Sequence, residues 1–348
     1  MKTVTRKDLV SALGKAKVPF STLESRDGWL IAAPALGARI MGMGIADENA
    51  LWIPPRIKRA PWSRGGNAGG LRTWLAPEAR ANGFFFSVEG VWDVQPAMDP
   101  AEYRETPAEE GWLAFRSEMT VRTQRGEEYR VAVMRRMKLE ESGSGRALRM
   151  RLVQGLQNAG TVPLDRQIGL WCIAHVPSDR GGMILIPIRG PRAAHPCYET
   201  PPAGVVREQG GCVFLQTGGV GMYKIGVGAG EAAGSIASLR PARLAGKTGD
   251  EQGWVLTAMR FSVDPAATYV DRPSHESVRD AENGDAVQVY NAAETGRLSY
   301  SELEVHAPAV LLAPGGAQEY EIEMTVAAGS GSEVCETLRE TTGISLSL

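Results

Sequence analysis

The feature that most constrains this chain is an alternation of apolar and polar residues with a period of two. In residues 319–326, EYEIEMTV, one tyrosine, isoleucine, methionine and valine alternate with glutamates and a threonine. Successive side chains of a β-strand point to opposite faces of the sheet, so this pattern predicts a half-buried strand. The same alternation recurs in residues 131–139, 148–152 and 255–263.

These strand patterns recur over most of the chain without helical spacers, and clusters of Gly, Pro, Asp and Asn separate them. Parallel strand pairs need crossover connections of about a dozen residues or more, so the pattern favours antiparallel sheets packed face to face. We therefore predict an all-β protein, a β-supersandwich of large antiparallel sheets. No linker divides the sequence, and residues 1–348 are predicted to form a single domain.

One stretch, residues 3–18, predicts an N-terminal helix. Thr5 followed three residues later by Asp8 resembles a capping box, and an apolar stripe that includes Leu13 ends near Pro19. This is the only helix that the periodicity indicates.

Charge excludes some partners. The chain has 38 Lys and Arg against 40 Asp and Glu, so no basic field favours nucleic acid. Charged residues interrupt the N-terminus where a signal peptide would be apolar, and no run reaches the ~18 apolar residues of a membrane span. We expect a cytoplasmic protein without nucleic-acid or membrane partners.

The sequence contains neither a paired-cysteine metal motif nor a dinucleotide-binding glycine motif. The four cysteines, Cys172, Cys197, Cys212 and Cys335, contain no Cys-x-x-Cys pair, so we expect buried, reduced thiols and predict no metal and no cofactor. The glycine run 226–230 lacks the dinucleotide-binding spacing and is predicted to be a turn.

Residues 300–308, YSELEVHAP, place Glu302, Glu304 and His306 on one face of a predicted strand. Residues two apart on a strand lie ~6.5–7 Å apart, so a sugar or another polyol can contact more than one of these groups. The alternative is a solvated strand face with ordinary exposed charges.

A second candidate is the segment 67–78, NAGGLRTWLAPE, where Arg72 and Trp74 share a strand face and Glu78 follows. An indole beside a guanidinium suits a sugar ring, because the ring's CH groups lie on the indole while the donor fork binds oxygens. The alternative is a core tryptophan.

A third candidate is the segment 168–177, IGLWCIAHVP, which places Trp171 and His175 on one strand face. His175 can act as a general acid, since its unperturbed pKa is near ~6.5. The alternative is a hydrogen-bonded structural histidine.

Several of these segments, in this order, resemble the galactose-mutarotase-like superfamily, which comprises the aldose 1-epimerases and bacterial relatives. The resemblance rests on VQVYN at 287–291, SELEVHAP at 301–308 and LLAPGGAQEYEIEMTV at 311–326. Upstream, LGARIMGMG at 36–44 is similar to an early strand pair, and GGLRTWLAPE at 69–78 resembles a segment of the superfamily's uncharacterised bacterial branch.

The resemblance implies a β-supersandwich with a saccharide-binding cleft on its concave sheet. It also implies a glutamate base that acts on the anomeric hydroxyl and a histidine acid that acts on the ring oxygen. By position Glu304 matches the base and Arg72 lies near the substrate-binding arginine. Trp171 stands where the resemblance places the histidine, and His175 would lie ~13 Å farther along the strand.

We therefore predict a carbohydrate-binding protein resembling aldose 1-epimerases, an isomerase class that uses proton transfer and no redox cofactor. Glu304 is the predicted base, and His175 or His306 the predicted acid. The predicted substrate contacts are Arg72, Trp74, Glu78, Trp171 and Glu302. Two alternatives stay open: a non-catalytic saccharide-binding or sensing module, motivated by Trp171, and a lyase or hydrolase acting on acidic sugars, with Arg72 as the carboxylate clamp.

Overall fold

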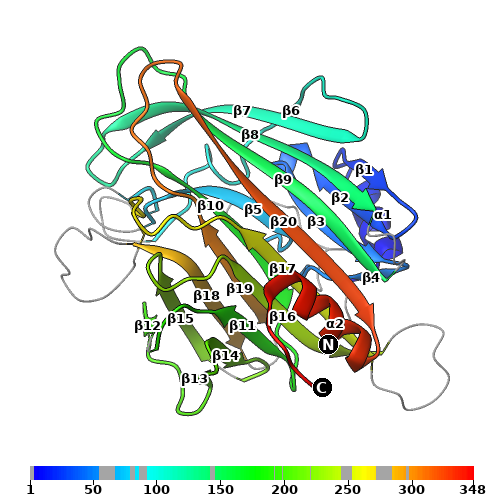
Figure 1. The fold of residues 1–348 in the computed structure, drawn as a ribbon. Helices are drawn as coiled ribbons and strands as arrows, with labels where there is room; N and C mark the ends of the chain where they lie inside the picture. Colours follow the sequence, from blue (N-terminus) through cyan, green and yellow to red (C-terminus); the bar gives the residue numbers. More distant parts are fainter. Residues whose placement is uncertain are drawn as a thin grey trace.

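The computed structural model describes residues 4–54, 67–78, 83–85, 92–141, 146–191, 193–197, 199–219, 221–243, 253–271, 284–294 and 298–348. Its strands form two large antiparallel sheets (Figure 1), which confirms the predicted fold class. The first sheet has the strand order β1 (Ser21–Glu24), β2 (Trp29–Ala33), β3 (Arg39–Ile45), β5 (Leu71–Ala76), β10 (Gly169–Pro177), β19 (Leu298–His306), β18 (Asp285–Glu294), β15 (Gly221–Gly228) and β12 (Ala194–Pro196), with β4 (Glu48–Asn49) paired to β3.

The second sheet has the strand order β13 (Val206–Gln209), β14 (Cys212–Gln216), β11 (Met183–Pro187), β16 (Ser235–Ala242), β17 (Gly253–Phe261), β20 (Ala317–Gly329), β9 (Ala147–Asn158), β8 (Glu128–Glu141), β7 (Trp112–Arg122) and β6 (Arg104–Glu105). The alternation at 319–326 lies in β20, where Tyr320, Ile322, Met324 and Val326 are buried. The strand predicted from this segment is therefore confirmed.

The first sheet turns one face toward the second sheet. Thr73 of β5 contacts Gln154 of β9 through their side chains, and apolar residues of both sheets form one core. Because side chains alternate along a strand, Arg72 and Trp74, the neighbours of Thr73, lie on the opposite face. The candidate residues therefore lie on the face of the first sheet that points away from the second sheet.

Helix α1 (Arg6–Lys15) covers part of this same outer face. The side chain of Thr5 accepts a hydrogen bond from the backbone N–H of Asp8, as the capping pattern predicts. Leu9 and Leu13 pack with Trp29 and other residues of β2 and β3. The helix is shorter at both ends than the predicted span.

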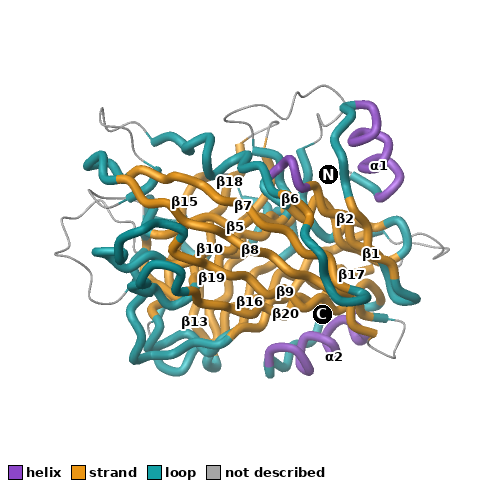
Figure 2. Tube along the Cα trace, turned by 90° about the horizontal axis from the view of Figure 1, so that it is seen from above, coloured by secondary structure: helices purple, strands orange, loops and turns teal. Residues whose placement is uncertain are grey.

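A second helix, α2 (Gly331–Thr342), covers the second sheet and was not predicted. Ser330 and Glu333 form a capping box, and the helix ends before Gly343, whose φ of 78° suits a residue without a Cβ. Val334 and Leu338 pack with residues of β16, β17 and β20. Figure 2 shows the two helices on opposite sides of the molecule. The N-terminal helix is confirmed, and the periodicity misses α2 because only two large apolar side chains of α2, Val334 and Leu338, are buried.

The prediction of a turn at the glycine run 226–230 is only partly right. The run at 226–230 does not begin with a turn, because Gly226 and Gly228 lie within β15 and pair with β18. A short 3-10 helix occupies Pro34–Leu36. Among the described residues, no helix has both the length and the apolar character needed to cross a bilayer.

Candidate functional site

The strand register brings the predicted residues of three segments to one face. Residues directly opposite each other on antiparallel strands point to the same side of the sheet. The face carries Arg72 and Trp74 from β5, Trp171 and His175 from β10, Glu302, Glu304 and His306 from β19, Gln288 and Tyr290 from β18, and Lys224 from β15. We call this set the polar face.

Glu304 lies at the centre of the polar face and is fully buried. Its Oε2 accepts a hydrogen bond of 2.8 Å from Nε1 of Trp171 and lies 2.9 Å from Nζ of Lys224. Burial raises the pKa of Glu304 to about 8, although the nearby Lys224 ammonium opposes that rise. Its Oε1 has no hydrogen-bond partner among the described residues.

Lys224 connects Glu304 to the molecular surface. Its Nζ lies 3.3 Å from Oε2 of Glu78 and 4.6 Å from the ring centroid of Trp171. Oε1 of Glu78 accepts a hydrogen bond of 3.0 Å from Nε1 of Trp92, whose side chain is 46% exposed. A chain of contacts therefore leads from the solvent-exposed Trp92 through Glu78 and Lys224 to the buried carboxylate of Glu304.

A second buried carboxylate, Glu302, is held by two nitrogen donors. Its Oε1 lies 2.8 Å from Nε2 of His175 and 3.2 Å from an Arg72 guanidinium nitrogen. Burial opposes ionisation of Glu302, but the charge of His175 and its hydrogen bond, followed by the charge of Arg72, outweigh burial and lower the pKa of Glu302 to about 2. Burial lowers the pKa of His175 itself.

His175 has partners at both ring nitrogens. Its Nδ1 lies 2.9 Å from the carbonyl oxygen of Gly70, and its ring packs against Trp52 and Tyr300. Its Nε2 faces Oε1 of Glu302 at 2.8 Å, so each nitrogen already has a polar neighbour. The structure therefore supports the structural alternative for this histidine.

His306 stacks on Trp171 with ring centroids 5.4 Å apart. Burial, reinforced by the positive charge of Lys224, lowers the pKa of His306 to about 3, so the ring is neutral. Its Nε2 lies 3.2 Å from Oε1 of Gln288, and the amide nitrogen of Gln288 is within 3.2 Å of a carboxylate oxygen of Asp271. This orientation of the amide puts the proton on Nε2 and leaves Nδ1 as a hydrogen-bond acceptor.

Aromatic rings surround Trp74 at one end of the polar face. The guanidinium carbon of Arg72 lies 3.5 Å from the Trp74 ring centroid, and Phe85 and Trp171 pack on the same ring at 4.8 and 5.5 Å. Trp74 is 4% exposed, which agrees with the core alternative. Its Nε1 nevertheless has no hydrogen-bond partner among the described residues.

The polar face thus contains unpartnered donors and acceptors close to aromatic rings. Among the described residues, Oε1 of Glu304 and Nδ1 of His306 lack donors, while Nε1 of Trp74 and Nε of Arg72 lack acceptors. A buried polar group without a partner costs about 1–3 kcal/mol. A ligand with several hydroxyl groups can satisfy both kinds, because each hydroxyl both donates and accepts.

A comparison with known protein families identifies the family of this chain. The family of unknown function DUF6786 matches residues 15–348. The chain belongs to the DUF6786 family. A comparison with curated protein sequences finds no match for this DUF6786 chain.

Solved structures share the fold of this DUF6786 chain. A candidate aldose 1-epimerase from Escherichia coli K12 is 13% identical with a TM-score of 0.56, over 89% of this chain and 99% of that chain. A galactose mutarotase-like protein from Lactobacillus casei ATCC 334 is 7% identical with a TM-score of 0.52, over 88% and 100%. A galactose mutarotase related enzyme from Lactobacillus acidophilus is 10% identical with a TM-score of 0.51, over 90% and 98%. At such identities the likeness shows the fold, which is galactose mutarotase-like.

The sequence placed Glu302, Glu304 and His306 of the DUF6786 chain on one strand face, and the structure confirms this. The alternative of a solvated face is wrong, because the three residues are 6%, 0% and 2% exposed. Sequence reasoning missed Lys224 and Trp92. For Lys224 a signal existed, since it is the only charged residue of the stretch 221–230, GMYKIGVGAG.

Proposed function

We propose that the protein binds a saccharide at the polar face and catalyses proton transfer at its anomeric centre, with Glu304 as the base. The observation that carries the proposal is Oε1 of Glu304, a buried carboxylate oxygen that has no hydrogen-bond partner among the described residues. The other oxygen is held by Trp171 and Lys224, so the carboxylate is fixed in orientation. A fixed carboxylate with one open oxygen suits a general base.

The reaction would proceed by ring opening. Oε1 of Glu304 takes the proton of the anomeric hydroxyl while the bond between the anomeric carbon and the ring oxygen breaks, and the ring oxygen receives a proton. The open-chain aldehyde rotates about its bond to the next carbon. Reversal of the same proton transfers closes the ring as the other anomer, so atoms and protons balance without a cofactor.

Lys224 supports this chemistry better than either histidine does as the proton donor. Both nitrogens of His175 have partners, and Nδ1 of the neutral His306 is an acceptor. The Lys224 ammonium lies 2.9 Å from Oε2 of Glu304 and carries protons that it can donate. We therefore assign the acid role to Lys224, and hydroxyl binding to His306.

The predicted substrate contacts fall into two groups. The exposed Trp92, which packs beside the buried Trp74, offers its ring face to the CH groups of a sugar, and Glu78 orients Lys224. Arg72 and Glu302 neutralise each other, with Asp99 3.7 Å from the guanidinium. Arg72 is already paired with Glu302, and Asp99, which pairs with Arg39 at 2.7 Å, lies beside it; this disfavours the acidic-sugar lyase or hydrolase with Arg72 as a clamp.

A second candidate function is saccharide binding without turnover. It is favoured by Trp171, because this indole occupies the position that the superfamily resemblance gives to the acid and donates to the base. Under this function the unpartnered atoms of the polar face bind hydroxyls, and no proton is transferred.

Binding is tested with a panel of neutral aldoses and sugar acids by following intrinsic tryptophan fluorescence. Trp74, Trp92 and Trp171 lie in or beside the polar face, so a bound sugar is expected to change their emission. The matched control is Trp112→Phe, which removes a tryptophan of β7 in the second sheet and should leave the ligand-induced change intact. If no sugar in the panel alters the emission, the proposal of a saccharide site is wrong.

A further inference from the structure

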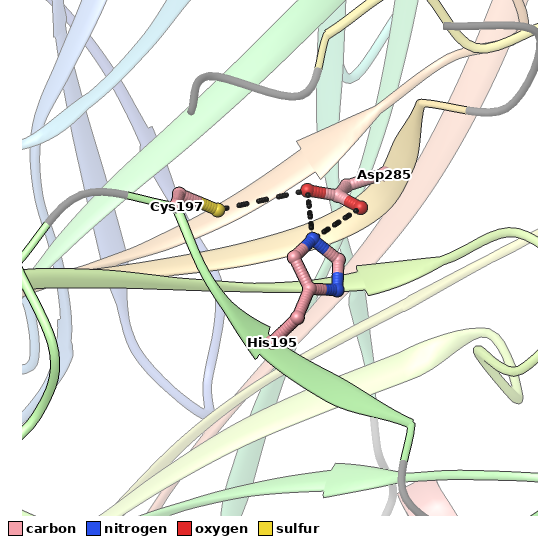
Figure 3. Close-up of side chains that lie close together, drawn as sticks. All are labelled: His195, Cys197 and Asp285. Carbon is pink, nitrogen blue, oxygen red and sulfur yellow. Dashed lines mark hydrogen bonds and ion pairs between the residues drawn. The ribbon is translucent and has the colours of Figure 1, made fainter. Parts of the chain in front are cut away.

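A second cluster of chemically reactive side chains lies near the edge of the first sheet (Figure 3). His195 is on the edge strand β12, Cys197 follows that strand, and Asp285 begins β18. One ligand atom from each residue lies within 4.8 Å of the other two. Nε2 of His195 is 3.2 Å from both carboxylate oxygens of Asp285, and Sγ of Cys197 is 3.7 Å from Oδ2.

We propose that His195, Cys197 and Asp285 bind a divalent transition-metal ion, and that Zn²⁺ fits them best. Zn²⁺ takes imidazole nitrogen, thiolate sulfur and carboxylate oxygen at about 2.0–2.3 Å, so atoms at tetrahedral angles around it lie roughly 3.2–3.8 Å apart. The observed separations of 3.2 and 3.7 Å fall in that range. Three protein ligands leave the fourth position to water or another ligand.

The ligand types favour a borderline or soft ion over Mg²⁺ and Ca²⁺. Those hard cations prefer cages made of oxygen atoms, whereas a thiolate and an imidazole together suit Zn²⁺ and its neighbours. Asp285 is 0% and Cys197 2% exposed. A carboxylate and a thiolate together cancel the two positive charges, which reduces the cost of burying the ion. The side chain of His195 is 32% exposed and gives the ion access from solvent.

Gly226 provides the space in which the ligands meet. It lies on β15, between the strands that carry the ligands, and pairs with His195 on one side and with Gln288 on the other. A Cβ at this position would lie 2.0 Å from Oδ2 of Asp285 and 2.9 Å from Nε2 of His195. The absence of a side chain on β15 therefore allows residues two strands apart to approach each other.

Gln288 orients the carboxylate ligand. Its amide nitrogen donates to Oδ2 of Asp285 at 3.1 Å, while its Oε1 lies 3.2 Å from Nε2 of His306. Hydrogen bonds to a metal-ligating carboxylate are a usual part of such sites and tune their affinity. One side chain thus links the proposed metal site to the polar face.

The test is a titration of the chelator-treated, dialysed full-length protein with Zn²⁺ alone, in the absence of sugar. We expect one Zn²⁺ per chain, and an affinity that falls at least tenfold in His195→Gln and in Cys197→Ser. Cys212→Ser, which alters a buried free cysteine of β14, is the matched control and should bind as the wild type does. Gly226→Ala leaves all three ligands in place and is expected to weaken binding as well.

Co²⁺ gives a second readout that does not depend on any variant folding. Bound to the wild type, it should show a thiolate-to-metal absorption in the near ultraviolet and the intense visible bands of a tetrahedral site. Less than stoichiometric Zn²⁺ together with the absence of these bands would overturn the proposal. Equal Zn²⁺ affinities in the wild type, His195→Gln and the Cys212→Ser control would also overturn it. Neither outcome bears on saccharide binding, since no sugar is present.

Discussion

The indole Nε1–H of Trp171 donates a hydrogen bond of 2.8 Å to Oε2 of Glu304. The superfamily resemblance implies an acid at the position of Trp171 and a base at Glu304, so this contact links the two positions. It fixes the carboxylate from β10, while Lys224 approaches the same oxygen from β15. The remaining oxygen, Oε1, has no hydrogen-bond partner among the described residues.

Trp171→Phe removes this donor while keeping an aromatic ring. We expect the variant to lose about 1–3 kcal/mol in the free energy of unfolding, because the buried carboxylate loses a hydrogen bond. Trp74→Phe is the matched control on the neighbouring strand, since Nε1 of Trp74 has no hydrogen-bond partner among the described residues. Denaturant unfolding of both variants at pH 8.5 measures the difference, and equal losses would contradict the role given to the Trp171 hydrogen bond.

The raised pKa of Glu304 makes the folded protein less stable as the pH rises. Its pKa is raised from 4.5 to about 8 in the folded protein, so the native state retains a proton that the unfolded state has lost. The stability that Glu304 contributes is present below pH 4.5 and is lost as the pH rises toward 8. Relative to Glu304→Gln, the wild type should lose up to about 1.4 kcal/mol per pH unit in this window. Parallel pH profiles of the two unfolding free energies would rule out the raised pKa.

His306 acts in the opposite sense. Its pKa is lowered from 6.5 to about 3, so the folded protein holds the ring neutral while the unfolded chain binds a proton. Its contribution is present above pH 6.5 and is lost as the pH falls toward 3. The free energy of unfolding of the wild type should therefore fall by up to about 1.4 kcal/mol per pH unit as the pH is lowered from 6.5 to 5, and His306→Gln should lack this part of the fall. An ordinary titration of this ring near pH 6.5 by NMR would contradict the account.

Lys224→Met removes the ammonium beside Glu304 without removing the aliphatic part of the side chain. Lys224 opposes the rise in the pKa of Glu304, so its loss should move that pKa above about 8. The rising, low-pH limb of any anomer-interconversion profile, which reports deprotonation of Glu304, should shift to higher pH, and the maximal rate should fall at least tenfold. Lys138→Met in β8 of the second sheet serves as the control. An unshifted profile in Lys224→Met would remove Lys224 from the proton-transfer scheme.

The sequence predicted the composition of the β19 face because period-two alternation is a local property of a strand. Glu302, Glu304 and His306 therefore appeared together before any pairing was known. Their burial was not predictable in the same way, because it depends on which segments cover the sheet. From one strand alone, charged residues on a shared face are expected to be exposed to solvent, and only the neighbouring strands and covering segments decide otherwise.

The partners themselves come from distant strands. Lys224 reaches Glu304 because β15 pairs with β18 and β18 with β19, and this order is not encoded in either segment alone. His195, Cys197 and Asp285 meet for the same reason, across β15 at Gly226. The second helix had a readable cap at Ser330 and Glu333, yet its apolar stripe was too sparse to be recognised.

The most direct test of the central claim is the rate of anomer interconversion for a panel of aldoses, followed by NMR in wild type and Glu304→Gln. Glu319→Gln, an exposed glutamate of β20, is the matched control. We predict that at least one aldose interconverts faster than in buffer, with a rate that rises with pH through about 8, the pKa of Glu304. The control should keep this rate and Glu304→Gln should lose it. Sugar binding with no acceleration in the wild type, or equal rates in wild type and Glu304→Gln, would contradict catalysis by Glu304.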